Sequence, residues 1–327
     1  MDQPLADIGI ISAYRFERDG SATKLDVANL DAELADPHGW LWLHFNLSNR
    51  RCHDWLARGA PLSDVARETL LDPDEHIRLD IFDEEIAGVL PDLHQEFMQE
   101  GDDLLRVHFA ISSRLMITAR RKPLRAIELT RRALDSGRKF PTPVSLFDAI
   151  VDQFADVIGR YSASLGDELD IVENHVLHDE IDDERLRLGR VRLQAIRTRR
   201  QLSQIRALFH RMEAREDVES EILLSAMRKL AQKFDALDYE FSAIYERARL
   251  LQDEIAGRMT AITNRRLFTL SVLTACMLPS TLVTGFFGMN TKDMPFQTGD
   301  GGTWYALLLV IAAGALTWWL LRRTKAL

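Results

Sequence analysis

One stretch near the C-terminal end of the chain combines a long apolar run with regularly spaced hydroxyl, amide and glycine positions. Residues 267–287 contain no ionisable side chain except Cys276, and Gly288-Met289-Asn290 follows them. Small and polar residues recur here at alternating steps of three and four, which places them on one face of a helix. This face, called the polar stripe below, is small and polar apart from two leucines. It consists of Asn264, Leu267, Ser271, Thr274, Leu278, Thr281, Gly285 and Gly288.

Neutral oxygen atoms are the chemistry that this stretch offers. Amide and backbone oxygens at Gly288, Met289 and Asn290, repeated around an axis, can hydrogen-bond to a cation that keeps its water shell. Small, hard ions such as Mg²⁺ shed water reluctantly, which favours recognition of the hydrated ion. No carboxylate lies within residues 267–287, so an ion cannot be chelated there by acidic side chains.

Two apolar runs are long enough to cross a membrane. About 20 helical residues cover the roughly 30 Å hydrocarbon layer, and residues 267–287 and 303–321 both meet this requirement. The connecting residues 288–302 are too few to form a domain. We therefore expect a hairpin that crosses the bilayer twice and returns both chain ends to the same side.

The charges beside the two runs predict their orientation. Arg265 and Arg266 precede the first run, and Arg322, Arg323 and Lys325 follow the second. By the positive-inside rule, both ends of the chain are cytoplasmic and residues 288–302 are periplasmic, in a multi-pass protein of the cell inner membrane. The N-terminal residues show no signal-peptide pattern.

The polar stripe has to be covered or wetted, because polar groups facing lipid are unfavourable. Two spans cannot enclose a channel, so several copies would have to surround an axis, each contributing its stripe. The alternative is that the small residues only allow helices to pack closely. Pro279 removes one helical hydrogen bond and favours a kink near Ala275.

The residues around this stretch resemble a known family. Leu278-Pro279-Ser280-Thr281, then Gly285, then Phe287-Gly288-Met289-Asn290, a short loop and a final span resemble the CorA family of divalent-cation transporters. Asn264-Arg265-Arg266 and the N-terminal part look most like its zinc-transporting ZntB branch. This resemblance implies a funnel-shaped homopentamer with an α+β cytoplasmic domain, long helices, two C-terminal transmembrane helices and a central pore lined by the first span.

The resemblance also implies roles for individual residues. Gly288, Met289 and Asn290 would form the selectivity loop, and Leu267 and Leu278 would form apolar constrictions that close the pore by dewetting. The pore wall implied in this way is Asn264, Leu267, Leu270, Leu278 and Thr281, to which the stripe adds Ser271, Thr274 and Gly285. At the outer mouth, Asp293 and Asp300 could concentrate cations, although Lys292 opposes them.

Residues 1–142 predict a soluble α/β domain. Alternating and β-branched patterns predict strands at residues 10–18, 22–25, 39–47, 77–82, 86–90, 104–111 and 115–120, with helices at 51–58 and 62–71. We find no phosphate-binding glycine loop, nucleophile elbow or zinc-ribbon cysteines, so the sequence does not predict an enzyme or a bound cofactor. His44 and His108 fall within strand patterns and are expected to be ordinary side chains.

Residues 143–266 predict a stalk of long helices. An acidic helix that starts near Pro143 precedes an arginine-rich helix at 185–212, and mutual neutralisation explains their charges better than nucleic-acid binding does, since the whole chain carries a formal charge of −9. From Leu223 to Ile255 a heptad seam requires a helical partner. Because no proline interrupts residues 219–278, this last helix could continue into the first span and carry conformational changes to the pore.

His175 and His178 lie three positions apart beside Asp179, which is an acceptable spacing for zinc or a regulatory cation, although such pairs also occur by chance.

The sequence therefore supports a multimeric divalent-cation transporter, zinc being the expected substrate. Magnesium, cobalt or nickel is the alternative within the same family. A second alternative is a helical scaffold or sensor that the hairpin, with the tail at 322–327, anchors in the membrane. The expected partners are further copies of the chain and the lipid bilayer, with no nucleic acid.

Overall fold

The computed structural model describes residues 8–26, 30–82, 85–93, 105–178, 184–215, 221–289 and 301–323. It divides into two compact units, Met1–Arg249 and Leu250–Leu327, which are described separately.

The first unit contains a seven-stranded sheet with the strand order β2-β1-β3-β7-β6-β5-β4. Strands β3 and β7 pair in parallel and the other neighbours pair antiparallel. The predicted strands are confirmed. Their bounds are β1 Ile10–Phe16, β2 Ala22–Lys24, β3 Trp40–Asn46, β4 Arg78–Phe82, β5 Glu85–Asp92, β6 Leu105–Ile111 and β7 Leu115–Arg120.

Side chains along β3 point alternately to the two faces of the sheet. Leu41, Leu43 and Phe45 belong to a core that contains residues of α2 and α3, such as Leu56 and Leu70. Burial of this apolar surface is the main force that holds the sheet to these helices. The short helices of the unit are α1 Leu30–Ala35, α2 Arg50–Arg58, α3 Asp64–Leu71 and α4 Arg125–Asp135. The two predicted helices correspond to α2 and α3, whereas α1 and α4 were not predicted.

The opposite face of β3 carries a buried polar network. Arg120 Nε donates to His44 Nε2 over 3.1 Å, and His44 Nδ1 lies 2.8 Å from the hydroxyl of Thr118, which also accepts from Trp42 Nε1. Complete burial lowers the pKa of His44 to about 3, so this imidazole is neutral and its Nδ1 carries the proton. His44 is thus a buried side chain of the core, which agrees with the prediction that it is an ordinary side chain.

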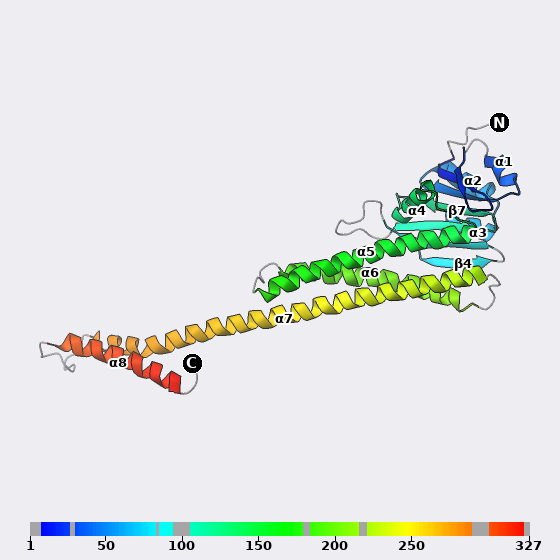
Figure 1. The fold of residues 1–327 in the computed structure, drawn as a ribbon. Helices are drawn as coiled ribbons and strands as arrows, with labels where there is room; N and C mark the ends of the chain where they lie inside the picture. Colours follow the sequence, from blue (N-terminus) through cyan, green and yellow to red (C-terminus); the bar gives the residue numbers. More distant parts are fainter. Residues whose placement is uncertain are drawn as a thin grey trace. The chain divides into compact units, whose positions relative to one another are not determined.

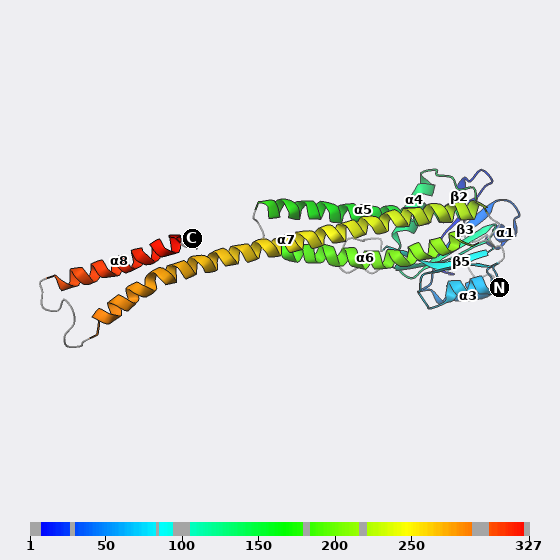
Figure 2. The same cartoon turned by 90° about the horizontal axis from the view of Figure 1, so that it is seen from below.

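Three long helices form a bundle within the first unit: α5 Pro143–Leu177, α6 Glu184–Glu213 and the first part of α7 Glu221–Phe287. Figures 1 and 2 show α5, α6 and this part of α7 side by side. The predicted heptad seam is buried, and its partners are helices of the same chain: Phe234 stacks on Phe209 of α6 and lies beside Phe154 of α5.

The charges of α5 are neutralised differently from the prediction. One expected pair between α5 and α6 is present, since Arg187 lies 3.0 Å from Glu168. Five other acids of α5 pair with α7. Lys233 lies between two of them, Asp152 and Asp156, at 2.5 and 2.6 Å. The further pairs with α7 are Asp148 with Lys229, and Asp170 and Glu173 with Arg247.

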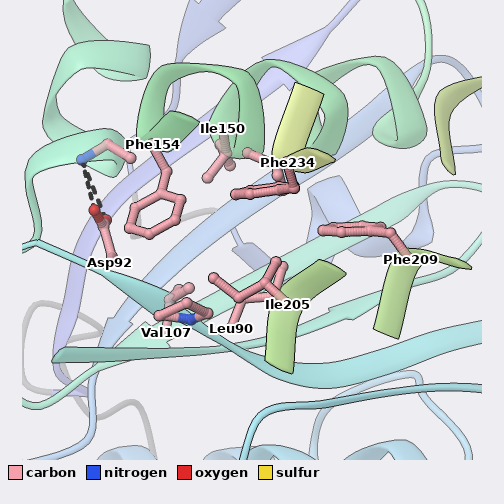
Figure 3. A pocket seen from close by; sticks show the side chains of 11 residues that line it. Leu90, Asp92, Val107, Ile150, Phe154, Ile205, Phe209 and Phe234 are labelled. Carbon is pink, nitrogen blue, oxygen red and sulfur yellow. Dashed lines mark hydrogen bonds between the residues drawn. The ribbon is translucent and has the colours of Figure 1, made fainter. Parts of the chain in front are cut away.

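A small cavity lies where the bundle meets the sheet (Figure 3). It measures about 20 Å³ and is lined by β5, β6, α4 and the three long helices, with Phe154, Phe209 and Phe234 among its residues. Asp92, the last residue of β5, borders it and accepts hydrogen bonds from the backbone N–H groups of Leu93 and Ala126, at 2.7 and 3.0 Å. Asp92 therefore caps α4, whose own N-cap residue provides no side-chain bond.

Burial raises the pKa of Asp92 from 3.8 to about 7 despite these bonds. The folded chain then holds this proton at pH values where the unfolded chain has lost it. The stability contributed by the protonated carboxyl is complete below pH 4 and is lost as the pH rises to about 7.

We predict that the thermal stability of the wild type, relative to Asp92→Asn, falls between pH 4 and 7 and is constant above it. The free energy of unfolding of the wild type, relative to that of the variant, should fall by at most about 1.4 kcal/mol per pH unit. Tryptophan fluorescence of the full-length protein in detergent measures it. Asp135→Asn, at the exposed end of α4, is the matched control. A difference between wild type and Asp92→Asn that does not vary with pH would show that Asp92 titrates normally.

The second unit contains the remainder of α7 and α8 Gly302–Arg323. Among the described residues, α7 and α8 are the helices long and apolar enough to cross a membrane. The structure thus confirms the α+β domain, the long helices and the two C-terminal apolar helices. It also confirms that the stalk helix continues into the first apolar run, because α7 is unbroken from Glu221 to Phe287 despite Pro279.

Candidate functional site

The polar stripe borders an open groove on the last part of α7. Thr274, Leu278, Thr281 and Gly285 of the stripe line it together with Met289 of the predicted selectivity loop. The groove measures about 750 Å³, and its remaining lining is apolar: Leu273, Met277, Leu282 and Phe286. The other predicted pore residues, Asn264, Leu267, Leu270 and Ser271, are exposed further back along the same helix.

Helix α8 contacts a different face of α7. The hydroxyl of Ser280 donates to the backbone carbonyl of Val310 over 3.2 Å. A Cβ atom placed on Gly314 would lie 3.5 Å from that hydroxyl and 3.7 Å from the carbonyl oxygen of Cys276. Small residues on both helices therefore allow the two backbones to approach at this point.

The geometry of the helix separates this contact from the stripe. Each residue advances roughly 100° around an α-helix, so Leu278 lies roughly 160° and Gly285 roughly 140° from Ser280. Thr274, at roughly 120°, lies on the same side. Helix α8 therefore leaves the polar stripe uncovered.

The threonine hydroxyls of the stripe are bonded to their own helix. Thr274 donates to the carbonyl of Leu270 and Thr281 to that of Met277, both over 2.9 Å. Their oxygen atoms keep a lone pair that can accept a hydrogen bond from water. The stripe can thus accept hydrogen bonds from water without leaving a hydroxyl proton unpaired.

The groove ends where α7 ends. Gly288 N–H donates to the carbonyl of Thr284 over 2.9 Å and Met289 N–H to that of Phe286 over 3.3 Å, which closes the last helical turn. The C-terminus of a helix carries partial negative charge, which favours cations near it. Asn290, Asp293 and Asp300 lie outside the described residues.

The histidines predicted as a further metal site have other partners. His175 Nδ1 lies 2.6 Å from the buried Glu184 on α6, with Arg187 beside it, and His178 Nδ1 donates to the carbonyl of Asn174. Asp179 lies outside the described residues. Across the part of the chain that the structure describes, no group of three or more His, Cys, Asp or Glu side chains could hold a metal ion.

Comparison with known proteins identifies the family of this chain. Residues 37–323 match the family described as CorA-like Mg²⁺ transporter protein. The chain belongs to this family. Members of the CorA-like family are transporters, so the chain is a membrane transporter and not an enzyme.

Individual relatives agree with this assignment. The divalent cation transporter CmaX of Pseudomonas aeruginosa is 25% identical over 97% of this chain and 96% of its own length. The zinc transport protein ZntB of Pectobacterium carotovorum is 26% identical over 96% and 95%.

Solved structures show the same fold. The structure of full-length CmaX matches with a TM-score of 0.79 at 25% identity, covering 98% of both chains. The CorA magnesium transporter of Methanocaldococcus jannaschii matches with a TM-score of 0.76 at 17% identity, covering 95% of this chain and 97% of its own.

For this CorA-like transporter we predict that Leu278→Ala raises metal-ion uptake into proteoliposomes by about tenfold, because a smaller apolar ring stays wet more easily. Val272→Ala, a similar truncation away from the groove, should leave uptake unchanged. If the two variants behaved alike, Leu278 would not form a constriction.

Proposed function

We propose that several copies of this chain surround an axis and pass hydrated divalent cations, zinc in preference to magnesium, through a pore lined by the polar stripe. The observation that carries this proposal is that α8 contacts α7 at Ser280, on the side away from Leu278 and Gly285. In a bilayer, the uncovered stripe requires water or another copy of the chain.

The close-packing alternative accounts for a different set of residues. Cys276, Ser280 and Gly314 already provide the small surface that the hairpin needs for its own packing. Thr274, Thr281 and Gly285 are not part of that surface, so packing within the hairpin does not explain them. The second alternative, a membrane-anchored scaffold or sensor, does not explain the stripe, because an anchor does not require polar residues on one face of its helix.

The chemistry of the groove suits an ion that stays hydrated. Its polar side chains are the hydroxyls of Thr274 and Thr281, and neither carries charge. Transfer of a fully dehydrated divalent ion onto such groups would be unfavourable, whereas exchange of hydrogen bonds with its water shell costs little. In this account Gly288, Met289 and Asn290 form the selectivity loop, and Asp293 and Asp300 concentrate cations at the mouth.

Zinc is favoured as the substrate because several curated relatives, ZntB of Pectobacterium carotovorum among them, are named zinc transport proteins. Magnesium, cobalt and nickel remain the alternatives, since the family is described by Mg²⁺ transport and CmaX by divalent cations. The hydroxyl-lined groove lacks the thiolate and imidazole ligands that bind zinc most tightly, which agrees with passage of the ion rather than storage.

We further propose a homopentamer in the cell inner membrane with both chain ends in the cytoplasm. Helix α7 supports a route for regulation, because its first part packs in the first unit through Phe234 and its last part carries the polar stripe. A displacement of α7 in the first unit would be transmitted along a continuous helix.

Uptake into proteoliposomes tests the function. The purified full-length protein should take up zinc faster than magnesium. Asn290→Ala should reduce zinc uptake by about tenfold, because each copy loses one neutral oxygen at the mouth that accepts hydrogen bonds from the hydrated ion. Running each measurement with and without a pH gradient shows whether protons contribute to the driving force.

Leu177→Ala, on the exposed end of α5 far along the sequence from the groove, is the matched control and should transport as the wild type does. Absence of uptake for zinc, magnesium, cobalt and nickel alike would contradict a transport function and favour the membrane-anchored scaffold. Faster uptake of magnesium than of zinc would contradict the assignment of the substrate alone.

A further inference from the structure

Ser280 differs from the neighbouring hydroxyl residues of α7 in the group to which it donates. Thr269, Thr274 and Thr281 each donate to the carbonyl four residues earlier in the same helix, over 2.9 Å. Ser280 instead donates across to Val310 of α8. Its hydroxyl therefore ties one helix of the hairpin to the other.

The residues around this bond make the position of α7 sensitive to it. Gly314 of α8 lies against Ser280, where a Cβ atom would just fit at 3.5 Å and a larger side chain would push the helices apart. Pro279, directly before Ser280, has no N–H group and so removes a hydrogen bond that would otherwise reach back to Ala275. The helix is thus least constrained by its own backbone where the bond to α8 is made.

Few forces fix the rotation of a helix about its axis in lipid. The hydrocarbon is as apolar as the side chains, so packing and hydrogen bonds to neighbouring helices set the rotation. Leu278 and Gly285 lie roughly 160° and 140° around the helix from Ser280. Whatever holds Ser280 against α8 therefore also determines where the polar stripe points.

We propose that Ser280 is a positioning residue: its hydrogen bond to Val310, packed against Gly314, fixes the rotation of α7 so that the polar stripe faces the pore. This rests on the proposed function, because the orientation of the stripe matters only if the stripe lines a wet path. Ser280 itself does not contact the ion.

Cysteine labelling of the full-length protein in proteoliposomes tests the proposal. In a background with Cys52→Ala and Cys276→Ala, Thr274→Cys places a thiol on the stripe, a turn and a half away from Ser280. Its rate of reaction with a membrane-impermeant thiol reagent reports exposure to water. Adding Ser280→Ala should slow this reaction by up to about threefold, because one interhelical hydrogen bond in a membrane protein changes the equilibrium constant between helix orientations by about that factor.

Thr269→Ala is the matched control, because it removes a hydroxyl that bonds only to its own helix. Gly314→Leu is a second variant, which displaces α8 from Ser280 without changing α7, and it should slow labelling as Ser280→Ala does. The same variants should lower the zinc-to-magnesium uptake ratio, whereas Thr269→Ala should not.

The outcomes separate the two proposals. If Thr274→Cys reacts equally fast with and without Ser280→Ala, or if Gly314→Leu has no effect, the positioning role is refuted while the wet stripe stands. If Thr274→Cys fails to react even with Ser280 intact, the proposed function fails first. Equal slowing by Thr269→Ala would show a general loss of helix stability and would also refute the positioning role.

Discussion

A helix that crosses a bilayer has to find a partner for each polar group it carries, because the hydrocarbon offers none. Helix α7 meets this constraint in two ways. On one side Ser280 bonds to α8 and small residues allow close approach. On the other side the hydroxyls of Thr274 and Thr281 satisfy their protons within the helix but leave oxygen atoms facing away from α8. In the proposed pore, that uncovered side would contact water and further copies of the chain.

The first unit of the structure packs the N-terminal part of the same helix into a bundle. The heptad seam of α7 is buried against α5 and α6, with Phe234 between Phe209 and Phe154. Ion pairs from Lys233 and Arg247 to acids of α5 reinforce that packing. Apolar burial supplies most of the stability, and the ion pairs, being partly exposed, contribute less. The helix that carries the polar stripe is therefore also part of the bundle core in the first unit.

Local sequence patterns were sufficient to predict strands and helices such as β3 and α7. They were not sufficient where a feature depends on a residue distant in the sequence. Alternation at Leu41, Leu43 and Phe45 was enough to place β3, and the periodicity of the seam was enough to place α7. Helix α4 was missed because its N-terminal cap is Asp92, 34 residues away in sequence. Likewise, composition could not show that Asp152 and Asp156 pair with Lys233 rather than with arginines of α6, nor that Gly314 packs on Ser280. The periodicity of the stripe could be predicted from the sequence, whereas the face of α7 that α8 contacts could not.

The central claim is that the polar stripe faces water in the assembled protein. The most direct measurement is a scan of single spin labels along residues 270–286 in liposomes, which compares accessibility to a water-soluble nickel chelate with accessibility to oxygen dissolved in lipid. The account predicts that chelate accessibility repeats with a period of about 3.6 residues and peaks at Thr274, Leu278 and Thr281. Oxygen accessibility should peak instead at positions between the polar stripe and the face that contacts α8. Oxygen maxima at the stripe, with no access for the chelate, would contradict the account.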